Sequence, residues 1–135
     1  MQNQPVKKIF FKKRVIAYLF DSYKINETEF ISDPDDFFQL GFGHIEHETH
    51  LDPHIHKEID RKINETSEFI YVVSGRMIIE IMALDGANVT TVEVHTGYGF
   101  LQCFGGHKIT IDAGTKYFEL KQGPYLGHAF DKVLV

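Results

Sequence analysis

The half of the chain after residue 67 is divided into short β-prone runs by turn-forming residues, and this pattern constrains the fold more than any other feature. Runs rich in valine, isoleucine and aromatic residues alternate with glycine-containing turns about every 8 to 12 residues. This spacing is typical of an all-β sandwich or barrel, with helix nearly absent. The strands that we predict in this half cover residues 68–73, 77–82, 89–94, 100–104, 108–112 and 115–121.

The turn residues also suggest how neighbouring runs pair. We predict one hairpin between the runs on either side of Gly75 and another between the runs on either side of Gly114. A third hairpin is expected to close through the loop 84–88, whose Asp-Gly-Ala-Asn sequence favours a turn. Earlier in the chain, the sequence favours a strand over residues 15–20 and one or two strands within 37–50.

The run 77–82 is apolar on both of its expected faces. Its odd-numbered residues are all apolar, and so are Ile78 and Met82 on the face that they share with Glu80. Because side chains alternate across a strand, the second face also needs cover, either from the N-terminal segment or from a partner subunit. We therefore predict a homodimer with Ile78 and Met82 at or near its interface.

Length and composition indicate one globular domain over residues 1–135. The chain has 135 residues, 43% of them hydrophobic, and a net charge of -5, which gives no global basic field for nucleic acid. Neither a signal peptide nor an apolar run long enough to span a membrane is visible, so no membrane partner is expected. A single cysteine, Cys103 in an apolar stretch, suits a reducing cytoplasm and favours a buried, inert thiol over a nucleophile.

Three histidines and one glutamate are placed as metal ligands could be. In a strand, residues two apart share a face, so His54 and His56 would direct both imidazoles to one point. Glu68 begins a β-prone run on what could be a neighbouring strand, and His107 follows a glycine pair about 40 residues later. Three imidazoles and one carboxylate suit a divalent transition metal: Fe, Mn, Ni, Co or Zn.

These residues resemble the two sequence motifs of the cupin superfamily. The first motif reads His-x-His, then Glu, then Gly after six residues, as in His54, His56, Glu68 and Gly75; the second ends at His107. The chain departs from the pattern in its eleven residues between His56 and Glu68 and in lacking the usual proline before His107. The resemblance implies a cupin-type double-stranded β-helix, a jelly-roll sandwich or barrel. Its core is expected at about 38–121, with an N-terminal extension 1–36 and a C-terminal tail 122–135.

For function, the resemblance implies a small-molecule site at a metal held by His54, His56, Glu68 and His107. The alternative is a degenerate site in which these groups bond one another or a ligand. Three functions stay open: a metal-dependent isomerase, epimerase or lyase acting on a sugar or sugar-derived acid, a non-haem iron dioxygenase, and a non-catalytic module that binds a small ligand. A fold shared by many chemistries does not choose among them.

Two further segments carry possible ligand-binding groups. The ending Lys121-Gln-Gly-Pro-Tyr125 is similar to that of small bacterial cupins associated with carbohydrate biosynthesis. Lys121 and Tyr125 could therefore contact an anionic or hydroxylated ligand at the mouth of the barrel, or they could be a surface lysine and a packing tyrosine. The histidine-rich segment 44–50 could hold a second metal on one strand face, or it could be the solvent-exposed face of that strand.

Overall fold

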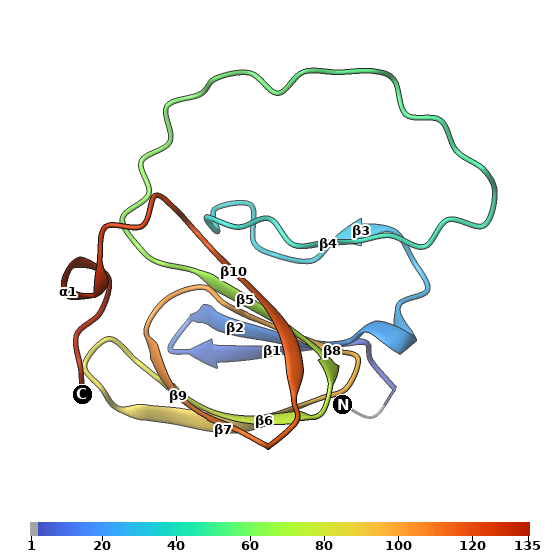
Figure 1. Ribbon diagram of the computed structural model, residues 1–135. Helices are drawn as coiled ribbons and strands as arrows, with labels where there is room; N and C mark the ends of the chain where they lie inside the picture. The colour runs from blue at the N-terminus through green and yellow to red at the C-terminus, as the bar shows by residue number, and fades with distance from the viewer. Residues whose placement is uncertain (1–2) are drawn as a thin grey trace.

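The computed structural model describes residues 3–135 and is all-β, with two very short helices (Figure 1). The helices are η1 (Ser22–Lys24) and α1 (His128–Asp131). The strands are β1 (Val6–Phe11), β2 (Arg14–Asp21), β3 (Glu29–Phe30), β4 (Gly41–Phe42), β5 (Glu68–Ser74), β6 (Arg76–Met82), β7 (Asn88–His95), β8 (Tyr98–Gln102), β9 (Gly106–Ile111) and β10 (Lys116–Lys121). No helix in the described part of the chain has both the length and the apolar character needed to cross a bilayer.

Two antiparallel sheets enclose one hydrophobic core. The first has the strand order β1-β2-β8-β5-β10 and the second the order β7-β6-β9, while β3 and β4 form a small separate pair. Ile70 of β5 and Phe100 of β8 lie in the same buried cluster as Met77 and Ile79 of β6, each of them 0–1% exposed. The apolar faces of the two sheets are therefore packed against each other, as the short-strand pattern predicts.

The predicted hairpin around Gly75 is wrong, because β5 and β6 belong to different sheets. Strand β5 pairs with β8 and β10, whereas β6 pairs with β7 and β9. Gly75 has a φ of 110°, and a Cβ there would collide with Thr115, so this position needs glycine. The glycine marks the point where the chain passes from one sheet to the other, which a local turn signal does not distinguish from a hairpin.

The predicted hairpin around Gly114 is wrong for the same reason. Strand β9 pairs with β6 in one sheet, and β10 pairs with β5 in the other. The two crossings lie side by side, since the Asp112 amide donates to the Arg76 carbonyl at 3.1 Å and the Arg76 amide donates to the Thr115 hydroxyl at 3.1 Å. A two-stranded ribbon thus bends as a unit from the first sheet into the second.

The third predicted hairpin is confirmed. Strands β6 and β7 pair antiparallel and are joined by a turn in which the Ala83 amide donates to the Ala87 carbonyl at 2.8 Å. The odd-numbered residues of β6 from 77 to 81 are each 0% exposed, as their parity predicts. Ile78 and Met82 are half-buried, and their contact with a partner subunit stays a prediction.

The N-terminal segment is part of the core, although the family resemblance leaves it outside. The strand predicted at 15–20 is confirmed as β2, which lies between β1 and β8 in the larger sheet. Residues 16–20 are all buried. The phenolic hydroxyl of Tyr18 donates to Asp36 at 3.0 Å, and the ring of Phe20 packs on Phe42 at 4.9 Å. Residues 33–42 thereby cover the face of β2 that carries these two rings.

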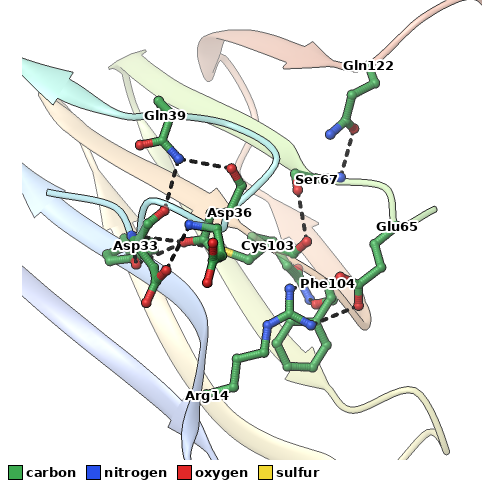
Figure 2. Close-up of polar contacts among 12 residues, drawn as sticks. Arg14, Asp33, Asp36, Gln39, Glu65, Ser67, Cys103, Phe104 and Gln122 are labelled. Carbon is green, nitrogen blue, oxygen red and sulfur yellow. Dashed lines mark hydrogen bonds and ion pairs between the residues drawn. The ribbon is translucent and has the colours of Figure 1, made fainter. Parts of the chain in front are cut away.

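A long loop separates the small β3–β4 pair from β5. Of the strands predicted within 37–50, the structure has only Gly41–Phe42, and residues 43–67 contain neither helix nor strand. The loop arches away from the sheets in Figure 1. At its start the Thr28 hydroxyl donates to the His44 carbonyl at 3.0 Å. At its end the Arg14 guanidinium bonds both carboxylate oxygens of Glu65, at 2.8 and 2.9 Å (Figure 2).

Candidate functional site

The four predicted metal ligands fall into two separate pairs. On the strands, His107 Nε2 lies 3.7 Å from Glu68 Oε1. On the loop, the rings of His54 and His56 meet edge to face, with centroids 5.1 Å apart. Among residues 3–135, no three histidine, cysteine or carboxylate side chains form a group that could hold a metal ion. The structure therefore assembles one half of the predicted shell and leaves the other half on the loop.

The strand predicted at His54–His56 is wrong, and the spacing of apolar residues in the loop gives a reason. Ile55, Ile59 and Ile63 recur every four residues, whereas a half-buried strand needs apolar side chains every two. Without an apolar face to bury, the segment has little to gain from joining a sheet. Ile55 is 93% exposed, and His54 Nδ1 bonds the Asp52 carbonyl at 2.9 Å.

Glu68 and His107 meet because β5 and β9 direct these side chains to the same interior. Glu68 is paired with Gln102 across β5 and β8, and His107 is paired with the fully buried Ile81 across β9 and β6. Side chains of directly paired residues lie on the same sheet face. The side chains of Glu68 and His107 are 13% and 25% exposed, so the pair is largely shielded and still reachable from solvent.

Gln102 determines which nitrogen of His107 carries the proton. Its amide nitrogen donates to the carbonyls of Phe104 at 3.0 Å and Gly106 at 2.7 Å, so both N–H groups are used. The amide oxygen must then face His107 Nδ1, which lies 2.7 Å away, and Nδ1 must be the donor. In the neutral ring, this leaves the lone pair of Nε2 facing Glu68.

The two side chains face each other without a direct hydrogen bond. The 3.7 Å between His107 Nε2 and Glu68 Oε1 exceeds the usual hydrogen-bond length. Metal bonds to imidazole nitrogen and carboxylate oxygen are about 2.1 Å long, so two donors on a tetrahedral ion lie roughly 3.4 Å apart. The observed distance is therefore close to the spacing of two such donors.

Burial shifts both groups towards their neutral forms. It raises the pKa of Glu68 to about 7, and the neighbouring Glu119 carboxyl contributes to this rise. Burial also lowers the pKa of His107. The positive charges of Lys121 and Lys132 oppose the rise at Glu68 and add to the fall at His107. A neutral imidazole is the form that binds metals or accepts a proton, so this environment preserves the reactive state of His107.

The two predicted ligand-binding residues differ in their surroundings. Lys121 is paired with Glu68 across β10 and β5, and its ammonium bonds Asp131 of α1 at 3.0 Å. Tyr125 lies on the tail and is 74% exposed. The structure therefore places Lys121 at the Glu68–His107 pair. For Tyr125 it gives only an exposed position.

Sequence reasoning missed Gln102, Glu119 and Asp131. The first two could have been found from strand parity, because Gln102 follows the buried Phe100 by two residues and Glu119 precedes Lys121 by two. Asp131 had no such signal, since its contact with Lys121 depends on how the tail turns back. The expected face of polar residues at 44–50 is absent because no strand forms there. His50 pairs instead with Glu48 at 2.8 Å in solvent.

Cys103 is a buried thiol, as its apolar context predicts. It is 2% exposed, and its sulfur lies 3.7 Å from Asp36 Oδ2 (Figure 2). Burial, with the nearby Asp36 carboxylate, raises the pKa of the thiol to about 12. Because the nucleophile is the thiolate, Cys103 is unreactive at neutral pH.

Comparison of the chain with models of known protein families, with curated proteins and with solved structures gave no significant match.

Proposed function

We propose that the protein is a cupin-type metalloprotein that binds and transforms a small molecule at the Glu68–His107 pair. The observation that carries the proposal is the orientation of His107. Gln102 holds Nδ1–H at 2.7 Å and leaves the Nε2 lone pair 3.7 Å from a carboxylate oxygen. An outer hydrogen bond of this kind on the second ring nitrogen is a regular feature of metal-ligating histidines.

The topology supports the cupin part of the proposal. In a double-stranded β-helix, a two-stranded antiparallel ribbon winds from one sheet into the other. The ribbon of β5 with β10 continues into the ribbon of β6 with β9 through the adjacent crossings at Gly75 and 112–115. A small ligand would enter at the end of the ribbon that carries Glu68 and Lys121.

Four protein groups would hold the metal: Glu68 and His107 on the strands, and His54 and His56 on the loop. Both loop imidazoles are exposed, and metal binding would require their segment to approach the strand pair. A bound divalent metal would supply a Lewis-acid position for a ligand oxygen or, if it is iron, a site for dioxygen.

The proposed substrate class rests on the polarity of the surroundings and on the family resemblance. A few polar groups converge next to an apolar interior, which is the usual makeup of a small-molecule site. We propose isomerase, epimerase or lyase chemistry on a sugar or sugar-derived acid, in which Glu68 or Glu119 could exchange a proton with the substrate. Dioxygenase activity and ligand binding without turnover are the competing functions.

The first test is metal binding by the purified protein. We expect about one equivalent of a divalent transition metal by elemental analysis, lost in His107→Ala and reduced in the double variant His54→Ala/His56→Ala. The matched control is His95→Ala, because His95 also lies on a strand and pairs with a glutamate at 3.0 Å, but in solvent. Equal metal content in wild type and His107→Ala would refute the site.

A Gln102 variant tests whether the hydrogen bond to His107 contributes to metal binding. In Gln102→Leu, Nδ1 of His107 loses its acceptor and the ring is free to change tautomer. We expect metal affinity to fall about 10- to 100-fold while the folded structure persists.

A second experiment separates the competing functions. Oxygen uptake by the Fe(II)-loaded protein would indicate a dioxygenase, and turnover of sugar acids without oxygen would indicate isomerase or lyase chemistry. Tight binding without either signal would indicate a binding module.

We also propose that the protein acts as a homodimer. Ile78 and Met82 share the half-buried outer face of β6 with Glu80, which pairs with Lys108 at 3.3 Å. A partner subunit would cover these two apolar side chains. The double variant Ile78→Glu/Met82→Glu should shift the protein to monomers in light scattering, and a monomeric wild type would refute the dimer.

A further inference from the structure

The C-terminal segment returns to the candidate site after β10 ends. The four-residue helix α1 lies beside the end of β10 that carries Lys121 (Figure 1). Its last residue, Asp131, bonds the Lys121 ammonium at 3.0 Å, with side-chain exposures of 20% and 28%. This contact is the ion pair that joins the tail to the strand next to Glu68.

Little else holds the helix in place. It has no buried residue, and Phe130 is 84% exposed. Its backbone hydrogen bonds are local, from residues 130–132 to the carbonyls of Gly127 and His128. A helix this short has almost no stability of its own in water. The Asp131 carboxylate is therefore an anion on a weakly held segment, and it is paired with Lys121 of the candidate site.

Two lysines bring positive charge to this end of the site, where the Glu119 carboxyl also acts on Glu68 and His107. Lys121 faces the same interior as Glu68, because the two residues are directly paired across β10 and β5. Lys132 follows Asp131 in the chain, and its charge acts on both Glu68 and His107. An anion that replaced Asp131 on Lys121 would thus lie beside the groups proposed to react.

We infer that the site takes a small molecule with a compact anionic group, a carboxylate or a phosphate, and that this group exchanges with Asp131 on Lys121. The inference rests on the proposed function, since it assumes that Glu68 and His107 form a ligand site. Asp131 then acts as an internal competitor, and the tail opens when the ligand's anion takes its place. A lysine ammonium suits this exchange because it binds anions as a point charge without a fixed geometry.

The test measures the affinity of the full-length protein for two probes, malonate and inorganic phosphate, by calorimetry. Asp131→Asn removes the competitor, so we expect it to tighten binding about fivefold or more, the lower end of ordinary coupling between linked sites. Lys121→Gln should weaken binding about tenfold, as for the loss of a charged hydrogen bond. Comparing the two probes identifies which anion the site prefers.

Two matched controls keep the result specific. Asp112→Asn also removes the acidic partner of an ion pair, with Arg76 at 2.9 Å, and Lys116→Gln removes a lysine from the other end of β10. Neither should change anion affinity. In unmodified protein, saturating anion should speed amide hydrogen exchange at residues 130–132, which tests the exchange without any substitution.

The inference is overturned if neither probe binds, if Lys121→Gln leaves anion affinity unchanged, or if Asp131→Asn leaves it at the wild-type value. In the last case Asp131 is only a clamp for the tail. Metal content of the same samples reports separately on Glu68 and His107. Protein without metal whose anion affinity still depends on Lys121 and Asp131 would refute the proposed metal site alone. Metal-loaded protein without any anion response would refute this inference alone.

Discussion

The strands around Glu68 and the loop around His54 carry the same kinds of side chain and differ in what holds them. Glu68 is held by paired strands on both sides of β5, and His107 by the pairing of β9 with β6 and by Gln102. His54 and His56 contact each other in solvent, on a loop fastened only at its two ends. The strand pair is thus fixed by the sheets, whereas no sheet positions the loop pair, so under the proposed function metal binding itself would have to bring the loop histidines to the strands.

The largest difference between the two regions should be in stability. Phe100→Ala empties a fully buried site in the core, and we expect it to cost about 4 kcal/mol in urea unfolding. Ile55→Ala removes an apolar side chain that is 93% exposed, so a change within about 0.5 kcal/mol is expected. A comparable loss in Ile55→Ala would mean that the loop packs against something in solution.

The next largest effect concerns the crossing between sheets. Gly75→Ala adds a Cβ at a φ of 110° against Thr115, and we expect it to cost about 3 kcal/mol. Gly86→Ala is the control, because Gly86 has a φ of 84° with open space around it. It should cost only about 1 kcal/mol through backbone strain. Equal costs at the two glycines would show that crowding at the crossing is unimportant.

A smaller effect should appear as a dependence of stability on pH. The pKa of Glu68 is raised from 4.5 to about 7, so folding favours its protonated form. The resulting stabilisation is complete below pH 4.5 and is lost as the pH rises through 7. With metal chelated, we expect wild type to lose about 2 kcal/mol relative to Glu68→Gln between about pH 4 and 8, after allowance for solvent screening.

The exposed Glu93 is the control for this titration. It faces solvent on β7, with half of its side chain exposed. The difference between wild type and Glu93→Gln should therefore show no loss of this size over the same pH range. A flat difference between wild type and Glu68→Gln would mean that folding leaves the pKa of Glu68 unchanged.

The smallest effect should come from the end of the loop. The Arg14 guanidinium bonds Glu65 and lies 4.1 Å over the ring of Phe104 (Figure 2). Because the pair is partly exposed, Arg14→Ala should cost only about 1 kcal/mol, yet proteolysis within residues 45–64 should become faster. Lys12→Ala, which removes an exposed lysine over Phe11, should leave both measurements unchanged. Unchanged cleavage in Arg14→Ala would show that Arg14 does not anchor the loop.

Strand positions were predictable from the sequence because they depend on local patterns. Alternation and glycine punctuation located every strand from β5 to β10, and parity identified the buried face of β6. Strand parity also predicted that the side chains of Glu68 and His107 face the interior between the sheets. These inferences succeed because burial on one face is a property that each strand carries in its own residues.

Strand partners and the loop were not predictable in the same way. A glycine with positive φ occurs both in hairpin turns and where a chain crosses between sheets. Gly75 alone therefore could not predict that β5 and β6 belong to different sheets. At His54–His56, alternation over three residues was too short to predict a strand, and the fourfold spacing of the isoleucines opposed it. Asp131 reaches Lys121 through the path of the tail, which no local pattern encodes.

The place of β2 in the larger sheet has a consequence for the order of folding during synthesis. The hairpin of β1 and β2 lies within residues 6–21, but the next neighbour of β2 is β8 at residues 98–102. At a translation rate of about 5–20 residues per second, β8 is synthesised on the order of 4 to 15 seconds after the hairpin. During this interval the β8-facing edge of β2, an unusually apolar strand, has no partner from its own chain. An unpaired apolar strand edge of this kind can pair with other chains until β8 is synthesised.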